Sequence, residues 1–145
     1  MTSIKNFNLL RPFNLELAKE GELLTSMNEA NDYKMLDFSI RNSNNKVEID
    51  AQLVNAENNF KYSNQDESSF RMKPLTWIDG KPVYKGDVLW YRGQQFCIEV
   101  RGYNPTCEDG LIGIVVKSQW ELISVGEQSW APFYQWQWDK PKQVV

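Results

Sequence analysis

Alternation of apolar and polar residues dominates the middle of the chain and predicts antiparallel β-structure. Leu36, Phe38 and Ile40 alternate with polar residues, and the alternation resumes over residues 47–53 after an asparagine-rich segment. A period of two places one face of each strand against a core and the other face in water. Because asparagine tolerates positive φ angles, residues 42–45 are expected to close a hairpin.

The stretch from Trp77 to Val100 predicts short strands separated by glycine turns. An apolar run over residues 88–91 follows a Lys-Gly-Asp turn, and an Arg-Gly turn leads into the alternating run 96–100. This pattern is typical of a small, strongly bent antiparallel sheet or barrel. Farther along the chain we expect a loop over 102–110 and two strands over 111–116 and 120–125.

One short helix is expected ahead of this β-structure. Residues 15–20 favour a helix, with Asn14 suited to the N-cap and Gly21 to the position after the helix end. A helix of this length is stable only when it docks on a sheet. The sequence therefore predicts a mainly β protein, α+β at most, built from one or two small SH3-like barrels or bent sheets with one short N-terminal helix.

Pro74 marks a candidate seam in the chain of 145 residues. We place an N-terminal arm, the short helix and an antiparallel β unit at residues 1–74, and a Trp-rich β unit at residues 75–145. One continuous domain is the alternative, since this length suits one ordinary domain or two very small ones. A short echo between residues 21–24 and 86–89, Gly-Glu-Leu-Leu and Gly-Asp-Val-Leu, raises the hypothesis of two related units.

Composition narrows the chemistry that the chain can perform. Histidine is absent, which removes the commonest general base, metal ligand and partner of a catalytic serine or cysteine. Two cysteines are too few for a structural zinc site, which takes about four ligands. We therefore predict no metal, no cofactor and no enzymatic activity. The net charge of −3 and the absence of a long basic run disfavour a nucleic-acid partner.

The remaining reactive groups have alternative interpretations. Reduced thiols are favoured over a disulfide between Cys97 and Cys107, because no secretory signal is evident. Cys97 lies in an alternating run and is either buried on a second covered face or exposed. Two acidic pairs are candidates for a general acid and base, but both fall in polar loops where solvated charges are favoured; they are Asp66 with Glu67 and Glu108 with Asp109.

No apolar segment of signal or membrane-spanning length is evident either. The longest apolar run covers residues 111–116, far fewer than a membrane span needs. We therefore expect a cytoplasmic location and no membrane partner.

The C-terminal segment supplies the sharpest candidate binding surface. If residues 130–138 are extended, Tyr134, Trp136 and Trp138 share one face, and Trp130 lies close to them in sequence. Such a row of rings can stack on sugars or bases, or anchor a protein partner. The alternative, that the row completes the core as a last strand, is favoured because large aromatic residues usually serve burial.

Three runs of sequence resemble small, uncharacterised bacteriophage and prophage accessory proteins. Residues 12–22 are similar to the opening of those proteins, residues 68–74 to the run that closes their first unit, and residues 80–89 to the Gly-Lys-Pro-Val-X-X-Gly-Asp-X-Leu run of their longer members. The chain departs from the pattern at Leu23 and Leu24, which stand where the family has Pro-Val, and at Arg71. The family has no agreed activity, so no residue role is transferred.

The resemblance implies a phage-associated protein that acts in the host cytoplasm. With no catalytic set and a surplus of aromatic residues, we expect it to bind a host or phage protein, and inhibition of a host defence system, as by an anti-CRISPR protein, is the sharpest version. The alternatives are a nucleic-acid or carbohydrate binding module that uses the aromatic face, and a homo-oligomeric virion component whose edge strands pair.

Overall fold

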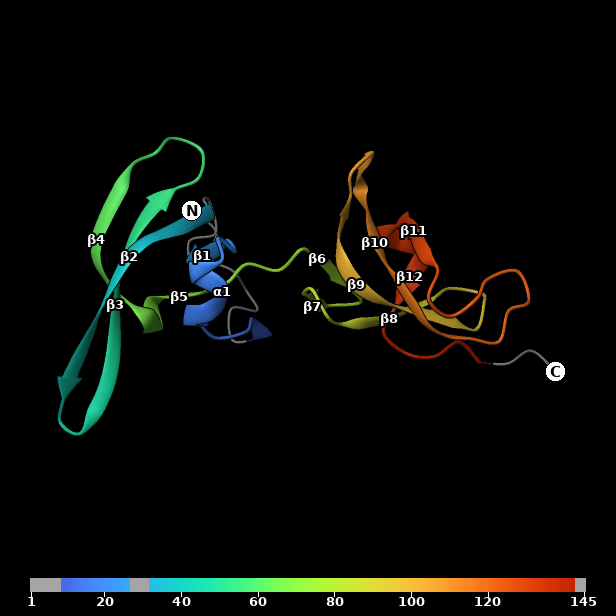
Figure 1. The fold of residues 1–145 in the computed structure, drawn as a ribbon, viewed down its shortest axis with the longest axis horizontal. Coiled ribbons are helices and arrows are strands. Elements are labelled where there is room, and N and C mark those ends of the chain that lie inside the picture. Colours follow the sequence, from blue (N-terminus) through green and yellow to red (C-terminus); the bar gives the residue numbers. More distant parts are fainter. Residues whose placement is uncertain (1–8, 27–31, 143–145) are drawn as a thin grey trace. The chain divides into compact units, whose positions relative to one another are not determined.

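The computed structural model describes residues 9–26 and 32–142 and divides the chain into two compact units, Met1–Lys73 and Pro74–Val145 (Figure 1). The division falls at the proline where the sequence places its seam. Both units consist mainly of antiparallel strands, and the fold class predicted from the sequence is confirmed. Among the described residues, no helix is long and apolar enough to cross a lipid bilayer.

The first unit begins with the predicted helix, α1 (Leu15–Lys19). The Asn14 side chain accepts a hydrogen bond from the Leu17 amide at 3.0 Å, and Gly21 follows the helix end with a φ of 94°. The strands form one five-stranded sheet of order β4-β3-β2-β1-β5. Their bounds are β1 (Leu24–Ser26), β2 (Asp32–Ser43), β3 (Lys46–Asn55), β4 (Lys61–Asp66) and β5 (Phe70–Met72), with a 3₁₀ turn, η2 (Glu67–Ser69), between the last two.

The second unit opens with a separate hairpin and then forms its own five-stranded sheet, of order β11-β10-β9-β8-β12. The hairpin consists of β6 (Thr76–Ile78) and β7 (Lys81–Val83). The sheet consists of β8 (Val88–Tyr91), β9 (Phe96–Asn104), β10 (Cys107–Ser118), β11 (Gln128–Pro132) and β12 (Trp136–Gln137). A 3₁₀ turn, η3 (Phe133–Gln135), joins the last two strands and carries the chain back to β8.

The two sheets share one topology, which supports the hypothesis of two related units. In each, the first strand pairs with the second and the last, and a 3₁₀ turn precedes the last strand. Ser26 pairs with Phe70 in one sheet as Tyr91 pairs with Trp136 in the other. Leu24 and Leu89, the final residues of the four-residue echo, lie on the equivalent first strands and are both fully buried.

Each sheet folds around its own apolar core. In the first unit Leu24, Ala51, Leu53 and Phe70 are buried, and the ring of Phe13 meets Phe70 edge-on at 5.0 Å. In the second unit the core consists of side chains from all strands of the bent sheet and from the hairpin; these are Ile78, Val83, Leu89, Phe96, Ile98, Val100, Leu111, Val115, Ala131 and Trp136.

The hairpin of β2 and β3 has the predicted turn but not a fully dry face. Asn44 and Asn45 have φ angles of 49° and 63°, as the turn requires. Ala51 and Leu53 are buried, whereas Ile40 and Val47 are mainly exposed. The hairpin extends beyond the residues that cover its apolar face. The alternating pattern therefore predicts burial correctly only at the end of the hairpin away from the turn.

Two local predictions in the second unit were wrong. The expected loop over 102–110 is a continuation of β9 and β10, joined by a tight turn at residues 105–106. The expected strand over 120–125 is a loop, because its hydrogen bonds stay local: the Ser118 hydroxyl accepts from the Trp120 amide and donates to the Ile123 carbonyl. Trp120 and Ile123 nevertheless pack against the core.

A close approach of two strands requires a glycine at position 113. An added Cβ there lies 2.4 Å from the backbone oxygen of Glu99 and 2.9 Å from Cδ1 of Ile98, whereas at Gly102, across the same sheet, it meets nothing within 4 Å. We therefore expect Gly113→Ala to lower the free energy of unfolding by about 1–3 kcal/mol through overpacking, and Gly102→Ala to change it far less. Urea denaturation of the two variants measures the difference, and equal midpoints contradict the packing of β9 on β10.

Candidate protein-binding surface

The C-terminal aromatic residues do not form a single extended row. The 3₁₀ turn η3 interrupts the strands β11 and β12, so Tyr134, Trp136 and Trp138 do not share a face and that prediction was wrong. Trp136 is fully buried, Trp138 is half-buried, and Tyr134 is 71% exposed. The alternative interpretation, completion of the core, holds for Trp136, and Trp138 packs against that core as a partly buried side chain. Tyr134 and Trp130 are exposed.

Trp136 is the anchor of this segment. Its ring meets Tyr91 and Phe96 edge-on at 5.4 and 6.1 Å, and its indole N–H donates to the carbonyl of Ala131 at 3.1 Å. The bond satisfies the one polar atom of a buried indole. Because residue 131 precedes η3 and residue 136 follows it, this single side chain fixes both ends of the turn.

Arg92 holds the same turn from outside. Its Nε donates to the carbonyl of Tyr134 at 2.8 Å, its Nη2 donates to Asp79 at 2.9 Å and its Nη1 donates to Gln137 at 3.3 Å. Its backbone amide donates to the carbonyl of Gln135 at 2.7 Å. The fork of the guanidinium thus joins the 3₁₀ turn, the last strand and the β6–β7 turn, and the exposed ring of Tyr134 projects from a fixed backbone.

Trp138 adds a second connection to the hairpin. Its indole N–H donates to the carbonyl of Ile78 at 2.8 Å, and Lys81 lies 6.0 Å from the centre of its ring. Trp138 therefore positions the hairpin in this unit and leaves only part of its ring at the surface.

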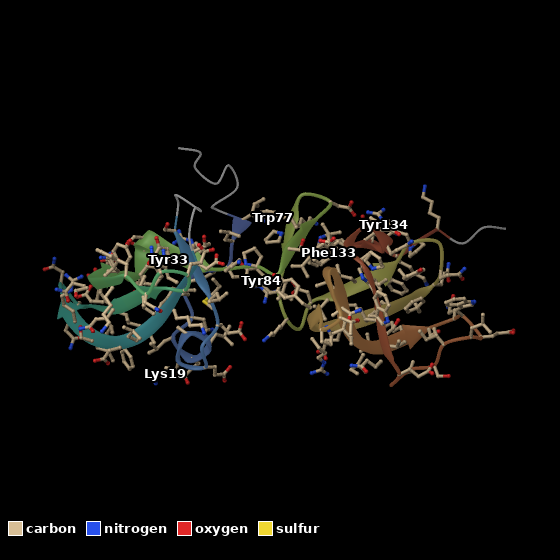
Figure 2. The ribbon with its side chains drawn as sticks, turned by 90° about the horizontal axis from the view of Figure 1, so that it is seen from above. Lys19, Tyr33, Trp77, Tyr84, Phe133 and Tyr134 are labelled. Carbon is tan, nitrogen blue, oxygen red and sulfur yellow. The ribbon has the colours of Figure 1, made fainter. Side chains whose placement is uncertain are left out.

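An aromatic surface results, formed by the exposed Trp77, Tyr103 and Tyr134 and the half-buried Phe133. Figure 2 labels three of these residues, Trp77, Phe133 and Tyr134. Strand β6, which carries Trp77, contacts η3, which carries Phe133 and Tyr134. The rings of Tyr103 and Phe133 are 6.4 Å apart, and the Tyr103 hydroxyl donates to the carbonyl of Leu75. Rigid aromatic residues that are partly open to solvent are typical anchors of protein interfaces.

Trp130 lies apart from this surface. In β11 it alternates with the buried Ala131, and the register places it beside Ile112 and Gly102 on the outer face of the sheet. Tyr103 is in register with Leu111 and Ala131, on the opposite face. Trp130 is 53% exposed, so it offers a second, separate ring to solvent.

Sequence reasoning missed Trp77, Tyr103 and Arg92 as members of the site. Trp77 lies on the outer side of β6 and is 38% exposed, with the buried Ile78 facing inward. Arg92 was noted only as part of a turn. Its neighbour Gly93, at the end of a strand, is a signal for a turn but does not reveal the bond to Tyr134, 42 residues away.

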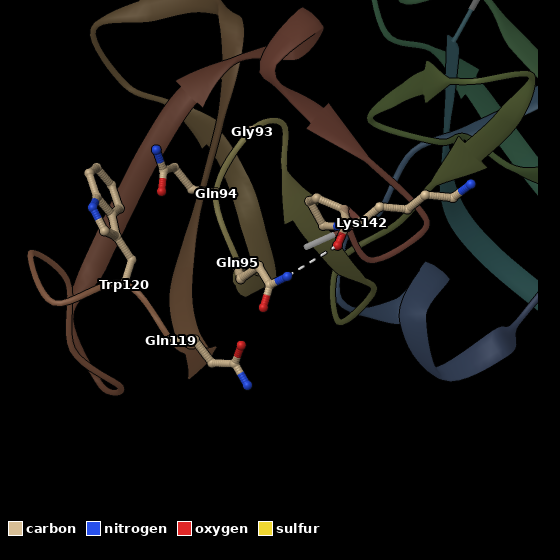
Figure 3. A pocket seen from close by; sticks show the side chains of 7 residues that line it. Gly93, Gln94, Gln95, Gln119, Trp120 and Lys142 are labelled. Carbon is tan, nitrogen blue, oxygen red and sulfur yellow. Dashed lines mark hydrogen bonds between the residues drawn. The ribbon is translucent and has the colours of Figure 1, made fainter. Parts of the chain in front are cut away.

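A pocket of about 290 Å³ lies elsewhere in the second unit (Figure 3). Three glutamines, Gln94, Gln95 and Gln119, line it together with Trp120, and Gln95 Nε2 donates to the carbonyl of Pro141 at 3.4 Å. Trp120 stacks on Phe96 with ring centres 5.8 Å apart. Amides next to an indole match the hydrogen-bonding and stacking needs of a sugar, and Lys142 adds one positive charge to the lining.

The acidic pairs have different outcomes. Asp66 accepts hydrogen bonds from the amide and hydroxyl of Ser68, each at 2.8 Å, and these bonds lower the pKa of its carboxyl, with Arg41 acting in the same direction. A carboxyl that stays ionised is a poor general acid. Asp109 is exposed, and the Glu108 side chain lies outside the described residues. The described residues contain no group of three acidic or cysteine side chains suited to a metal ion.

Arg41 forms ion pairs with acidic side chains of the first unit. It bonds to Glu48 at 2.6 Å and Asp50 at 3.2 Å, and also lies 3.5 Å from Asp66. The pKa of Arg41 is raised, chiefly by the charge of Asp50 and then by that of Glu48. A cation already paired with carboxylates is poorly placed to receive phosphate groups.

Comparisons with known proteins give no match: no family model fits the chain, and neither the curated proteins nor the solved structures include one that matches it.

Cys97 is a free thiol, buried between Phe96 and Ile98. The strand is therefore covered on both faces here, and burial raises the pKa of the thiol. We expect native Cys97 to resist iodoacetamide at pH 8, where an open thiol of pKa about 8.5 reacts readily. Peptide mapping after native and denatured alkylation measures this, and equal labelling contradicts the burial.

The same shift predicts a pH dependence of stability. Because the folded pKa exceeds the unfolded one, the folded protein retains a proton that the unfolded chain releases, so the free energy of unfolding falls as pH rises above about 8.5. Cys97→Ala should show a shallower fall between pH 8 and 10 than the unmodified chain. Identical slopes in urea titrations contradict the prediction.

Proposed function

We propose that this protein is a non-enzymatic phage or prophage accessory protein that binds a host or phage protein in the host cytoplasm. Its most specific role is inhibition of a host defence system, in the manner of an anti-CRISPR protein. The phage setting rests on the sequence resemblance of residues 12–22, 68–74 and 80–89. The binding mode rests on the aromatic surface.

The observation that carries the binding mode is the exposure of Tyr134 on a fixed backbone. Arg92 and Trp136 hold η3 from two sides, so the backbone that carries the ring is already ordered before a partner covers it. Trp77 and Tyr103 supply further apolar area close by. No chemical step is needed for inhibition by such a surface, because blocking a partner requires only contact.

The proposal predicts a loss of inhibition when the aromatic surface is truncated. A host with an active CRISPR–Cas system is challenged with a sensitive phage, with and without the protein, and plaques are counted. The unmodified chain should restore plaques, and Trp77→Ala combined with Tyr134→Ala should reduce this effect about tenfold or more, because both rings are proposed anchors. Plaque counts on hosts with other defence systems show which system is the target.

Phe60→Ala is the matched control, since Phe60 is an exposed aromatic residue of the other unit. Thermal unfolding confirms that all variants remain folded. No rescue of plaques in any host, or equal rescue by the double variant, contradicts the proposal. Light scattering on the purified chain tests the virion alternative, which requires a stable homo-oligomer.

The glutamine-lined pocket favours a carbohydrate-binding module as the second candidate function. Under this alternative, oligosaccharides quench tryptophan fluorescence in a saturable way, and Trp120→Phe removes the response while Trp130→Phe keeps it. An oligonucleotide panel measured in parallel tests the nucleic-acid form of the alternative. Absence of quenching with every panel removes this candidate.

A further inference from the structure

An apolar recess of about 400 Å³ lies beside the aromatic surface. Its lining consists of Leu75, Tyr103, Asn104 and Phe133, none of which carries a charge. Leu75 and Phe133 are half-buried, and Tyr103 is 45% exposed. The recess is continuous with the aromatic surface, because Tyr103 and Phe133 belong to both. Apolar walls without charge favour an uncharged, apolar occupant.

Two side chains of this lining carry polar groups: the Tyr103 hydroxyl donates to the carbonyl of Leu75, whereas Asn104 has an unused donor. Asn104 is 6% exposed, and its Oδ1 accepts hydrogen bonds from the amide and hydroxyl of Thr106, each at 2.9 Å. These bonds fix which end of the side chain is oxygen. Its Nδ2 is closed off from solvent and has no hydrogen-bond partner among the described residues.

An unpaired buried donor is costly and is rare in folded proteins. Leaving one unsatisfied costs about 1–3 kcal/mol, so a native structure that retains one calls for an explanation. The hydrogen bonds from Thr106 satisfy the Oδ1 of Asn104, but nothing in this turn satisfies its Nδ2. Because Asn104 lines the recess, a carbonyl oxygen delivered there would satisfy this nitrogen and recover the cost once the atoms that cover the nitrogen shift aside.

We propose that the recess binds an extended peptide segment of the protein partner, with an apolar side chain filling the cavity and the backbone carbonyl beside it accepting a hydrogen bond from Asn104 Nδ2. Every peptide residue carries a carbonyl within a few bonds of its side chain, which matches one lone N–H donor next to an apolar cavity. The proposal rests on the proposed function, because it takes the partner to be a protein, and it names the chemistry of the contact.

Selection from a library of random linear peptides displayed on phage, with the intact chain immobilised, provides the probe. We expect the selected peptides to share an apolar anchor residue. Adding a synthetic copy of one to the isotope-labelled chain should shift the side-chain amide resonances of Asn104. Asn104→Asp retains the acceptor for Thr106 but removes the donor, and it should weaken the peptide about tenfold, as expected for one hydrogen bond in a closed site.

Asn55→Asp is the control for an introduced charge. Asn55 is also buried, and its Oδ1 accepts from the amides of Glu57 and Asn58 in a comparable turn of the other unit. It should leave peptide affinity unchanged. If Asn104→Asp unfolds the chain, the same peptide with its anchor carbonyl reduced to a methylene tests the bond in the unmodified protein and should also bind about tenfold more weakly.

Failure to select any peptide overturns the inference. So does unchanged affinity for both Asn104→Asp and the reduced peptide, or a peptide that leaves the Asn104 amide resonances in place. Equal affinity for N-methylacetamide and for the peptide assigns the site to small carbonyl compounds and also overturns it. The plaque assay reports separately on the proposed function: a peptide that binds the recess of a chain without inhibitory activity contradicts that function and leaves this site intact.

Discussion

The second unit depends on the burial of one tryptophan. Trp136 comes from a strand of only two residues, yet its ring fills the core against Tyr91 and Phe96 and its indole N–H is satisfied by Ala131. Burying a side chain of this size contributes several kcal/mol, far more than the few hydrogen bonds of so short a strand. The ring therefore holds β12 beside β8 and, with Arg92, sets the position of the turn from which Tyr134 projects.

In the first unit a smaller aromatic ring anchors the last strand of the sheet beside the first strand. Phe70 occupies the position equivalent to Trp136, on the last strand and opposite the first, and Phe13 packs against it edge-on. The units differ in what they leave uncovered. The first leaves Phe60 and the aliphatic end of a long hairpin exposed, and the second leaves aromatic rings on a fixed turn as well as the aliphatic residues Leu122 and Val125. Aromatic rings offer more area for each side chain ordered, which is why the proposed binding surface is placed on the second unit.

Local sequence signals correctly predicted the elements that depend only on neighbouring residues. The helix with its Asn14 cap and the Asn44–Asn45 turn each follow from a few neighbouring residues. The strand expected at 120–125 failed because its alternation reflects packing of a loop on the core. The extended aromatic row failed because a 3₁₀ turn after Pro132 rotates the chain, and that turn is stabilised by Arg92, which is distant in sequence.

The candidate site was predictable in composition but not in arrangement. Tryptophan and tyrosine near the C-terminus could be named from the sequence, and Tyr134 and Trp130 are exposed. Contacts between distant segments decide where each tryptophan lies: Trp136 in the core, Trp138 against Ile78 and Trp77 at the surface. Asn104 gives no sequence signal at all, because its importance lies in a donor left unpaired by the fold.

The central claim is that the chain works by contact through the surface around Tyr134. Photocrosslinking in living host cells tests it most directly, with p-azidophenylalanine in place of Tyr134 and, as control, in place of Phe60. The account predicts one discrete adduct with a host or phage protein from position 134 and none from position 60. The same adducts from both positions, or none from position 134 while the protein remains active, would contradict it.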